Sequence, residues 1–412
     1  MPRDSSAPTR RHRLTGLVAL GVVGALCLSA CSVRKQYGVA TTVVSPKGTC
    51  DSSRIVEIGA ALDLSGPQAS LGREYLAGVR MAVAQVNQSG GVLKNHRCLE
   101  LLYKNTEGSP KIADKAVLDL VNNEVVAFLV APFGASEVTS SGADLGLAGV
   151  PTVSVSSLDT TTRTKPYPQM FPVTPPESVL AHAAISYARS RHWTSVAAVG
   201  EDNPAGAEGV ADFSSDAAKA GLIVTGTAHG ADIGSELQTL QGGNPQGLFV
   251  AGDDLGVGAI LSARQSSGWN VPVVAGPVAA DAAVVGELGS AGAAGVSVVA
   301  PKALVVSGAN GVPSDPTMVA FLAALRRQEG SSAFNGSVGP YAQAYDGIEL
   351  LAYVGTSINS VHPGDIRTFI ENANYQGLLA NYNYTSGAHI GVDTSQVKVV
   401  ALSSLSGGLF HS

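Results

Sequence analysis

The stretch IVEIGAALDLSGPQASLGREYLAGVRMAVAQVNQSGG, residues 55–91, predicts a strand, a loop and a helix in succession. Residues 55–62 are mostly β-branched or small and apolar, and the Gly-Pro pair that follows ends this run, which indicates a strand entering a loop. Beyond the loop, apolar residues from Leu76 to Val86 recur at steps of three and four and therefore share one helical face. The same order of elements recurs to about residue 300, which predicts βαβ units and parallel sheets.

The N-terminus has the organisation of a secretory signal. Several Arg residues precede an apolar run, Leu14 to Leu28, that is too short to span a bilayer comfortably. The sequence LSAC ending at Cys31 matches the lipobox, in which a peptidase cuts before a Cys that already carries diacylglycerol. We expect residues 1–30 to be a lipoprotein signal peptide, Cys31 to be lipidated and residues 31–49 to form a polar tether to the membrane. An ordinary signal peptide or a short anchor helix is the alternative.

The cysteines agree with export. Cys27 leaves with the signal and Cys31 is expected to carry lipid, so Cys50 and Cys98 remain as an even pair in an oxidising compartment. Cys50 lies just before the first predicted strand and Cys98 opens the second, and these strands are neighbours in a sheet of this kind. We therefore predict a disulfide between them. The alternative is two unpaired thiols. A bridge requires a close approach of the two Cα atoms, and the sequence alone does not give that distance.

The charge and the length limit the possible partners and the architecture. Of 26 Lys and Arg and 32 Asp and Glu, the signal removes four Arg and one Asp, which leaves 22 against 31 and a formal charge of −9. Nucleic acid is therefore not expected as a partner. The length exceeds what one hydrophobic core comfortably fills, which predicts two lobes.

The recurring elements predict an α/β fold in which each lobe is an open, mostly parallel sheet flanked by helices. We assign residues 50–172 to the first lobe and 173–300 to the second lobe. Residues 301–377 are expected to return to the first lobe, and residues 378–412 to supply C-terminal strands and a tail to the second, so that about three crossings join the lobes. In such sheets a ligand binds beyond the carboxyl ends of the strands, where the strand order reverses.

Several segments resemble the type I periplasmic binding proteins, and among them the branched-chain amino-acid (Leu/Ile/Val) receptors of ABC transporters. These segments are Leu62–Pro67 with Gly72, Val86–Gly91, Ala131–Ser136 followed by Gly149–Pro151, and Ala275–Pro277. The resemblance runs from about Ile55 to the C-terminal strands. It implies a two-lobed fold of that family, with hinge closure over a ligand and an ABC permease as partner.

The resemblance also implies a ligand site. The family's two loops that hold a ligand carboxylate fall on Gly134 to Ser136 and on Ser156 to Leu158. Aromatic positions of the family fall on Leu71, on Ala205 and near Asp253, and its ammonium-binding acid falls near Pro277 or Val278. The expected ligand-binding residues are Leu71, Phe133, Gly134, Ala135, Ser136, Ser156, Ser157, Leu158, Asp202, Ala205, Asp253 and Pro277. Alternatively, Ser136 caps its helix, and Ser156 and Ser157 form a turn.

Four acidic residues could bring negative charge to this cleft: Glu201, Asp202, Asp253 and Asp254. A ligand that touches them would carry a positive group. Solvated loop carboxylates are the alternative, because most Asp and Glu residues are exposed.

We expect a lipid-anchored, extracytoplasmic solute-binding protein of an ABC importer that captures an amino acid or a similar small polar ligand. It would be a monomer without cofactor or metal, held in the cell envelope at the outer face of the cytoplasmic membrane or facing the periplasm. No enzyme activity is expected, since HExxH, CxxC, GxSxG and Walker motifs do not occur. The alternative is a sensory or protein-binding lipoprotein with the same fold and a degenerate ligand site.

Overall fold

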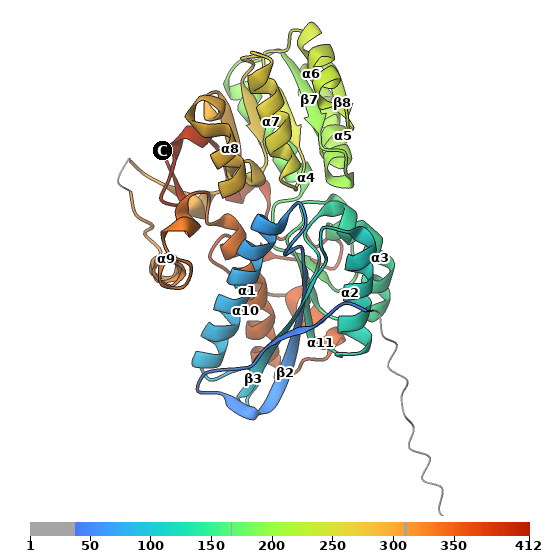
Figure 1. Ribbon diagram of the computed structural model, residues 1–412, viewed down its shortest axis with the longest axis vertical. Helices are drawn as coiled ribbons and strands as arrows, with labels where there is room; N and C mark the ends of the chain where they lie inside the picture. The colour runs from blue at the N-terminus through green and yellow to red at the C-terminus, as the bar shows by residue number, and fades with distance from the viewer. Residues whose placement is uncertain (1–37, 166, 309–310) are drawn as a thin grey trace, which may run out of the picture. The chain divides into compact units, whose positions relative to one another are not determined.

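The computed structural model describes residues 38–165, 167–308 and 311–412 (Figure 1). The expected signal peptide and the expected lipidation site at Cys31 lie outside the described residues. Among the residues that are described, no helix has both the length and the apolar character needed to cross a bilayer.

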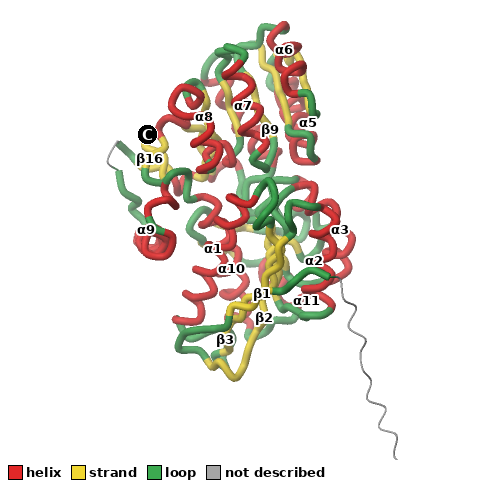
Figure 2. The backbone as a smooth tube through the Cα atoms, in the orientation of Figure 1, coloured by secondary structure: helices red, strands yellow, loops and turns green. Residues whose placement is uncertain are grey.

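The first lobe is built on a six-stranded sheet with the order β1-β3-β2-β4-β5-β6, in which only β1 runs antiparallel to its neighbour. Figure 2 shows these strands between two groups of helices. The strands are β1 (Thr42–Val44), β2 (Asp51–Leu62), β3 (Arg97–Asn105), β4 (Phe128–Val130), β5 (Thr152–Ser154) and β6 (Met170–Pro172). The helices are α1 (Ala69–Gln88), α2 (Pro110–Asn122), α3 (Ala135–Ala148), α9 (Pro316–Glu329), α10 (Gly339–Ile358) and α11 (Pro363–Ile370).

The opening stretch folds as its pattern predicts. β2 is buried from Val56 onward apart from Glu57, since helices cover both faces of the sheet. Helix α1 buries Leu76, Val79 and Val83 on one face. It packs along α10, although more than 250 residues separate the two in sequence (Figure 1).

The second lobe repeats the plan with the strand order β15-β11-β10-β9-β7-β8. All neighbours are parallel except the pair β11 and β15. Its strands are β7 (Ser195–Gly200), β8 (Ile223–His229), β9 (Leu248–Ala251), β10 (Val273–Ala275), β11 (Val296–Pro301) and β15 (Val397–Ala401). Its helices are α4 (Glu177–Ser190), α5 (Pro204–Lys219), α6 (Ile233–Gly242), α7 (Gly256–Ser266) and α8 (Ala282–Ala293). The predicted α/β fold with two mostly parallel sheets is confirmed.

The chain passes between the two sheets three times, after β6, after β11 and before β15. Two small sheets lie along the returning segments. One joins β12 (Val305–Val306), β16 (Leu405–Ser406) and β17 (Leu409–His411), and the other joins β13 (Asn374–Gln376) and β14 (Asn381–Asn383). Tyr382 of β14 donates a hydrogen bond to Asp346 of α10 at 2.8 Å, so this part of the tail contacts a helix of the first lobe. The predicted lobe boundaries stay predictions.

The expected tether is wrong for its C-terminal part. Residues Thr42–Val44 form β1, which pairs antiparallel with residues 101–103 of β3. The carbonyl of Val39, just before β1, accepts a hydrogen bond from the buried Lys104 ammonium at 2.8 Å. The β-branched residues of this short segment favour a strand, and the strand covers the edge of the sheet at β3. A covered edge cannot pair with a strand of another molecule.

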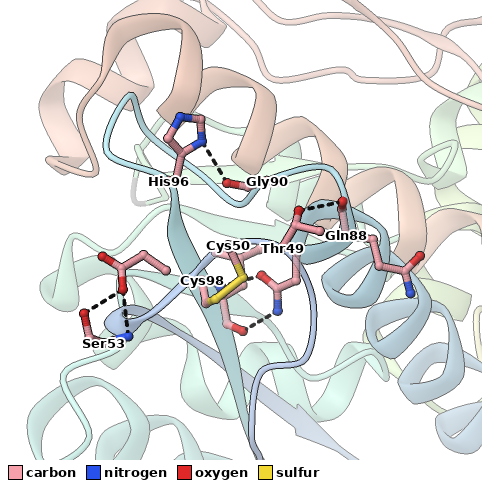
Figure 3. Close-up of a disulfide and its surroundings, with 10 residues drawn as sticks. Thr49, Cys50, Ser53, Gln88, Gly90, His96 and Cys98 are labelled. Carbon is pink, nitrogen blue, oxygen red and sulfur yellow. Dashed lines mark hydrogen bonds between the residues drawn. A yellow bond between two sulfur atoms is a disulfide. The ribbon is translucent and has the colours of Figure 1, made fainter.

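The predicted disulfide between Cys50 and Cys98 is confirmed (Figure 3). The Cα atoms lie 5.1 Å apart because β2 and β3 are parallel neighbours. Hydrogen bonds lie beside the bridge. In one of them the Thr49 hydroxyl donates to the Gln88 carbonyl at 3.0 Å, which joins the segment before β2 to the end of α1 (Figure 3).

Candidate functional site

A small cavity lies where strand ends of both sheets and helix α10 meet. Its volume is about 40 Å³, which holds a few water molecules. Its lining is mainly apolar and includes the predicted residues Leu71, Ser157, Asp253 and Pro277. We call it the inter-lobe cavity; it is lined by Leu71, Tyr75, Val155, Ser157, Thr174, Gly252, Asp253, Pro277, Val278, Val298, Ala300, Pro301, Leu304, Ser337, Gly339, Pro340, Gln343 and Phe410.

The carboxylate of Asp253, which follows β9 in the second lobe, is bound by hydrogen-bond donors of the first lobe. The Ala135 amide, in the first turn of α3, donates to Oδ1 at 3.4 Å, and the Ser156 hydroxyl donates to Oδ2. The Ser157 amide adds a third hydrogen bond. Helix α3 is 14 residues long, so its N-terminus also favours negative charge. We call these three donors the anion pocket.

Two more carboxylates adjoin Asp253. One oxygen each from Glu201, Asp253 and Asp254 lies within 4.8 Å of the others, and we call these residues the acid cluster. Glu201 is only 6% exposed. Its Oε2 accepts hydrogen bonds from the Asp254 amide at 3.1 Å and from the Asn203 side chain at 3.0 Å. Its Oε1 has no hydrogen-bond partner among the described residues.

The acid cluster resists ionisation. Burial, followed by the charge of Asp254, raises the pKa of Asp253 to about 8. Burial raises the pKa of Asp254 to about 6. Burial also raises the pKa of Glu201 well above its ordinary value, and the two neighbouring carboxylates add to this rise. A positive charge placed here would reverse these shifts.

Other acids are buried along the same junction. Glu177, fully buried on α4, accepts a hydrogen bond from the Ser157 hydroxyl at 2.6 Å, and burial raises its pKa. Glu74 on α1 interacts with Asp281 at the start of α8, and burial together with Asp281 raises the pKa of Glu74 to about 9. None of these acids forms an ion pair with Lys, Arg or His in the part of the chain that the structure describes.

Gly252 positions the acid cluster. Its φ is +141°, a backbone conformation that L side chains rarely adopt. A Cβ at this position would lie 2.1 Å from Oε2 of Glu201 and 2.7 Å from its Cγ. Only glycine therefore allows the turn after β9 to pass over the Glu201 side chain.

Several of the predicted residues come together in the structure. Ala135, Leu158 and Ala205 are buried and pack with Val138 in one small apolar cluster. Because Ala205 belongs to α5 of the second lobe, this cluster joins the two lobes. Their direct contact with a ligand stays a prediction.

Other predicted residues lie outside the cavity. Phe133 is buried with its ring centroid 5.2 Å from that of Tyr75, behind the cavity wall. Asp202 is exposed to solvent. The alternative that Ser136 caps its helix is wrong, because the N-cap of α3 is Gly134 and Ser136 lies inside the helix.

A polar chain crosses the cavity wall and was not predicted from the sequence. The Tyr75 hydroxyl donates to Oε1 of Gln343 at 3.4 Å, and Nε2 of Gln343 donates to the Thr174 hydroxyl at 3.1 Å. Tyr75 lies four residues after Leu71 on α1, so helical spacing could have placed it on the same face. Gln343 and Phe410 come from distant segments, and no local pattern connects them to the site.

Larger hollows occur on the surface. A groove of about 590 Å³ beside α9, α10 and β13 is lined by residues that include Tyr345, Asp346, Glu349 and Tyr375. It is open to solvent and receives no strand-end loop of either large sheet. The inter-lobe cavity has contributions from both sheets and is therefore the better candidate site.

Comparison with known proteins agrees with this arrangement. A family model described as periplasmic binding protein matches residues 55–401. The chain is similar to a solved type 1 periplasmic binding protein from Bordetella pertussis, with a TM-score of 0.73 and 21% identity over 84% of this chain and 96% of that one. It is also similar to the branched-chain amino acid substrate-binding protein LivJ from Streptococcus pneumoniae, solved with isoleucine, with a TM-score of 0.68 and 18% identity over 84% and 99%.

A third similar structure is the leucine-binding protein LivK from Thermotoga maritima, with a TM-score of 0.69 and 18% identity over 84% of this chain and 98% of that one. Among curated protein sequences, none matches the chain. At these identities the solved structures establish the shared fold.

Proposed function

Because the chain belongs to the periplasmic binding protein family, we propose that it is a lipid-anchored, extracytoplasmic solute-binding protein of an ABC importer. Its ligand is a small polar molecule, an amino acid or a similar compound, held in the inter-lobe cavity. The observation that carries the proposal is the composition of that cavity, which joins Leu71 and Ser157 of the first lobe to Asp253 and Pro277 of the second.

Hinge closure is the proposed mechanism. A ligand that contacts both lobes binds the closed arrangement better than the open one, and so shifts the population toward it. Hydrogen bonds between the two lobes define the closed arrangement. Asp253 of the second lobe is bound in the anion pocket of the first, and the Leu255 amide of the second lobe donates to Oε1 of Gln68 of the first at 2.8 Å. The permease would then recognise the closed surface.

The second candidate is a sensory or protein-binding lipoprotein with the same fold. One observation favours it: the cavity of about 40 Å³ is far smaller than typical ligand pockets of roughly 300 Å³ or more. Under this alternative, contacts made by the chain itself replace those of a solute.

A thermal-shift screen of purified residues 32–412 separates the two candidates. The panel holds amino acids, amides, aliphatic amines, polyamines and small sugars. A ligand at one hundred times its Kd stabilises the native state by about 2.7 kcal/mol, which a thermal scan detects readily. A specific shift that saturates with concentration supports the solute-binding protein. A panel without any shift contradicts it and favours the protein-binding lipoprotein.

A further inference from the structure

We propose that the ligand is a small aliphatic amine without a carboxylate, whose ammonium group pairs with Asp253 at the wall of the inter-lobe cavity. This inference rests on the proposed solute-binding function and adds the chemical class of the solute. It follows from three features of the site: an anion pocket that is already filled, a cavity without cationic groups, and acids with unused acceptors.

The anion pocket is filled by the protein itself. The Ala135 amide, the Ser156 hydroxyl and the Ser157 amide all bind the Asp253 carboxylate. Donors at a helix N-terminus would otherwise suit the carboxylate of a ligand. With Asp253 in place, a ligand carboxylate would have to displace it and leave it buried beside Asp254.

The cavity offers nothing else to an anion. No Lys, Arg or His is among the described residues that line it. The polar side chains at its wall are mostly committed to each other: the Ser157 hydroxyl donates to Glu177, and Gln343 joins Tyr75 to Thr174. An unpaired carboxylate moved into such surroundings would cost several kcal/mol of solvation.

The same surroundings suit a cation. Asp253 lines the cavity, and no Lys, Arg or His within the described ranges pairs with the acid cluster behind it. Among the described residues, neither Oε1 of Glu201 nor Oδ1 of Asp254 has a hydrogen-bond partner. An ammonium group carries three donors and no acceptor, so beside Asp253 it would supply the positive charge that the cluster lacks.

The remaining lining selects the rest of the ligand. Val155, Val298, Leu304 and Phe410 present apolar side chains to the cavity. An alkyl chain gains about 0.8 kcal/mol for each CH₂ group that such a surface buries. A short branched or linear alkylamine therefore matches the acid and the apolar wall, and the cavity of about 40 Å³ must widen through the proposed hinge motion to admit it.

Protonation gives the proposal an independent signature. The uncharged Asp253 carboxyl must lose its proton when an ammonium group pairs with it, and burial holds its pKa at about 8. The titratable groups that interact with Asp253 are Asp254, Glu201 and Glu177 of the second lobe and Tyr75 of the first. Asp63 and Glu137 of the first lobe interact with Asp254. All of these groups are acids, so none of them supplies a positive charge that would replace the ammonium group. The affinity for an amine should therefore rise with pH, by up to about tenfold per pH unit below pH 8.

The test compares three probes of one shape by calorimetry at pH 7.5 with EDTA present. These are 3-methylbutylamine, leucine, which adds a carboxylate to the same skeleton, and 3-methylbutanol, which replaces the amine by a hydroxyl. We expect the amine to bind at least tenfold tighter than either analogue. The variant Asp253→Asn should lose at least tenfold in amine affinity together with the pH dependence. The matched control Glu287→Gln, which removes an exposed acid of the second lobe, should bind like the wild type.

The other outcomes overturn the inference in distinguishable ways. Leucine binding tighter than the amine would refute it and leave the solute-binding function intact. Equal binding of the alcohol would show that charge is not recognised and would refute it too. Stabilisation by Ca²⁺ or Mn²⁺ alone that Asp253→Asn abolishes would assign the acid cluster to a metal instead. If the amine does not bind but another compound of the panel does, the inference is refuted and the proposed function stands. If no compound of the panel binds, the proposed function is refuted as well.

Discussion

Gly252→Ala tests how the acid cluster is held. The substitution forces an L residue to a φ of +141°, which costs about 1–3 kcal/mol in a conformation that is nearly restricted to glycine. It also drives a methyl group to within 2.1 Å of Glu201, and overpacking of this kind costs a further ~1–3 kcal/mol. Because Glu201 is only 6% exposed, its side chain cannot swing aside freely. We expect a total loss of about 3 kcal/mol or more in the free energy of unfolding.

Gly221→Ala is the matched control. Gly221 has a φ of +76°, and no atom lies within 4 Å of an added Cβ. Gly221→Ala should therefore lose only the backbone contribution, about 1–2 kcal/mol of the free energy of unfolding. Urea unfolding followed by the fluorescence of the two tryptophans, Trp193 and Trp269, measures both variants. Equal losses for Gly252→Ala and Gly221→Ala would show that Glu201 does not press against the turn, and would refute the packing described for the acid cluster.

Two further predictions concern stability. Replacing Cys50 and Cys98 together by Ser opens a loop with a sequence separation of 48, so the free energy of unfolding should fall by about 4 kcal/mol in urea unfolding. Reductant should then destabilise the wild type but not the variant, and equal sensitivity would contradict the bridge. The second prediction concerns pH: the folded-state pKa values of Asp253 and Glu74, about 8 and about 9, exceed the ordinary values of 3.8 and 4.5. The native state therefore binds more protons than the unfolded state in that window, and stability should fall as pH rises. We expect a loss of about 3–4 kcal/mol from each of these two groups, about 7 kcal/mol together, between pH 5.5 and 8.5, since a group that is protonated only in the native state loses about 1.4 kcal/mol of stabilisation per pH unit. A melting temperature that rises over this range would contradict the buried acids.

The strand-end loops of the site could be predicted from the sequence. Each apolar run that ends at Gly, Pro or Ser marks the carboxyl end of a strand, and parallel strands bring those ends to one edge. The family resemblance placed Leu71, Ser157 and Asp253 in one site, and all three line the inter-lobe cavity. The disulfide followed from the strand pattern, because neighbouring parallel strands bring Cys50 and Cys98 together.

The remaining part of the site depends on contacts between distant segments. Gln343 is 268 residues away from its hydrogen-bond partner Tyr75, and nothing in either helix specifies the other. The binding of Asp253 in the anion pocket depends on how the two lobes meet, which no local periodicity encodes. The strand Thr42–Val44 was missed for a different reason. A short β-branched run becomes a strand only when an open sheet edge is available to pair with it.

A crystal structure of the chain with the strongest ligand of the screen would locate the binding site. We expect ligand density in the inter-lobe cavity, with a positively charged group within hydrogen-bonding distance of the Asp253 carboxylate. Density in the groove beside Tyr345 and Tyr375, with the inter-lobe cavity unchanged, would contradict it.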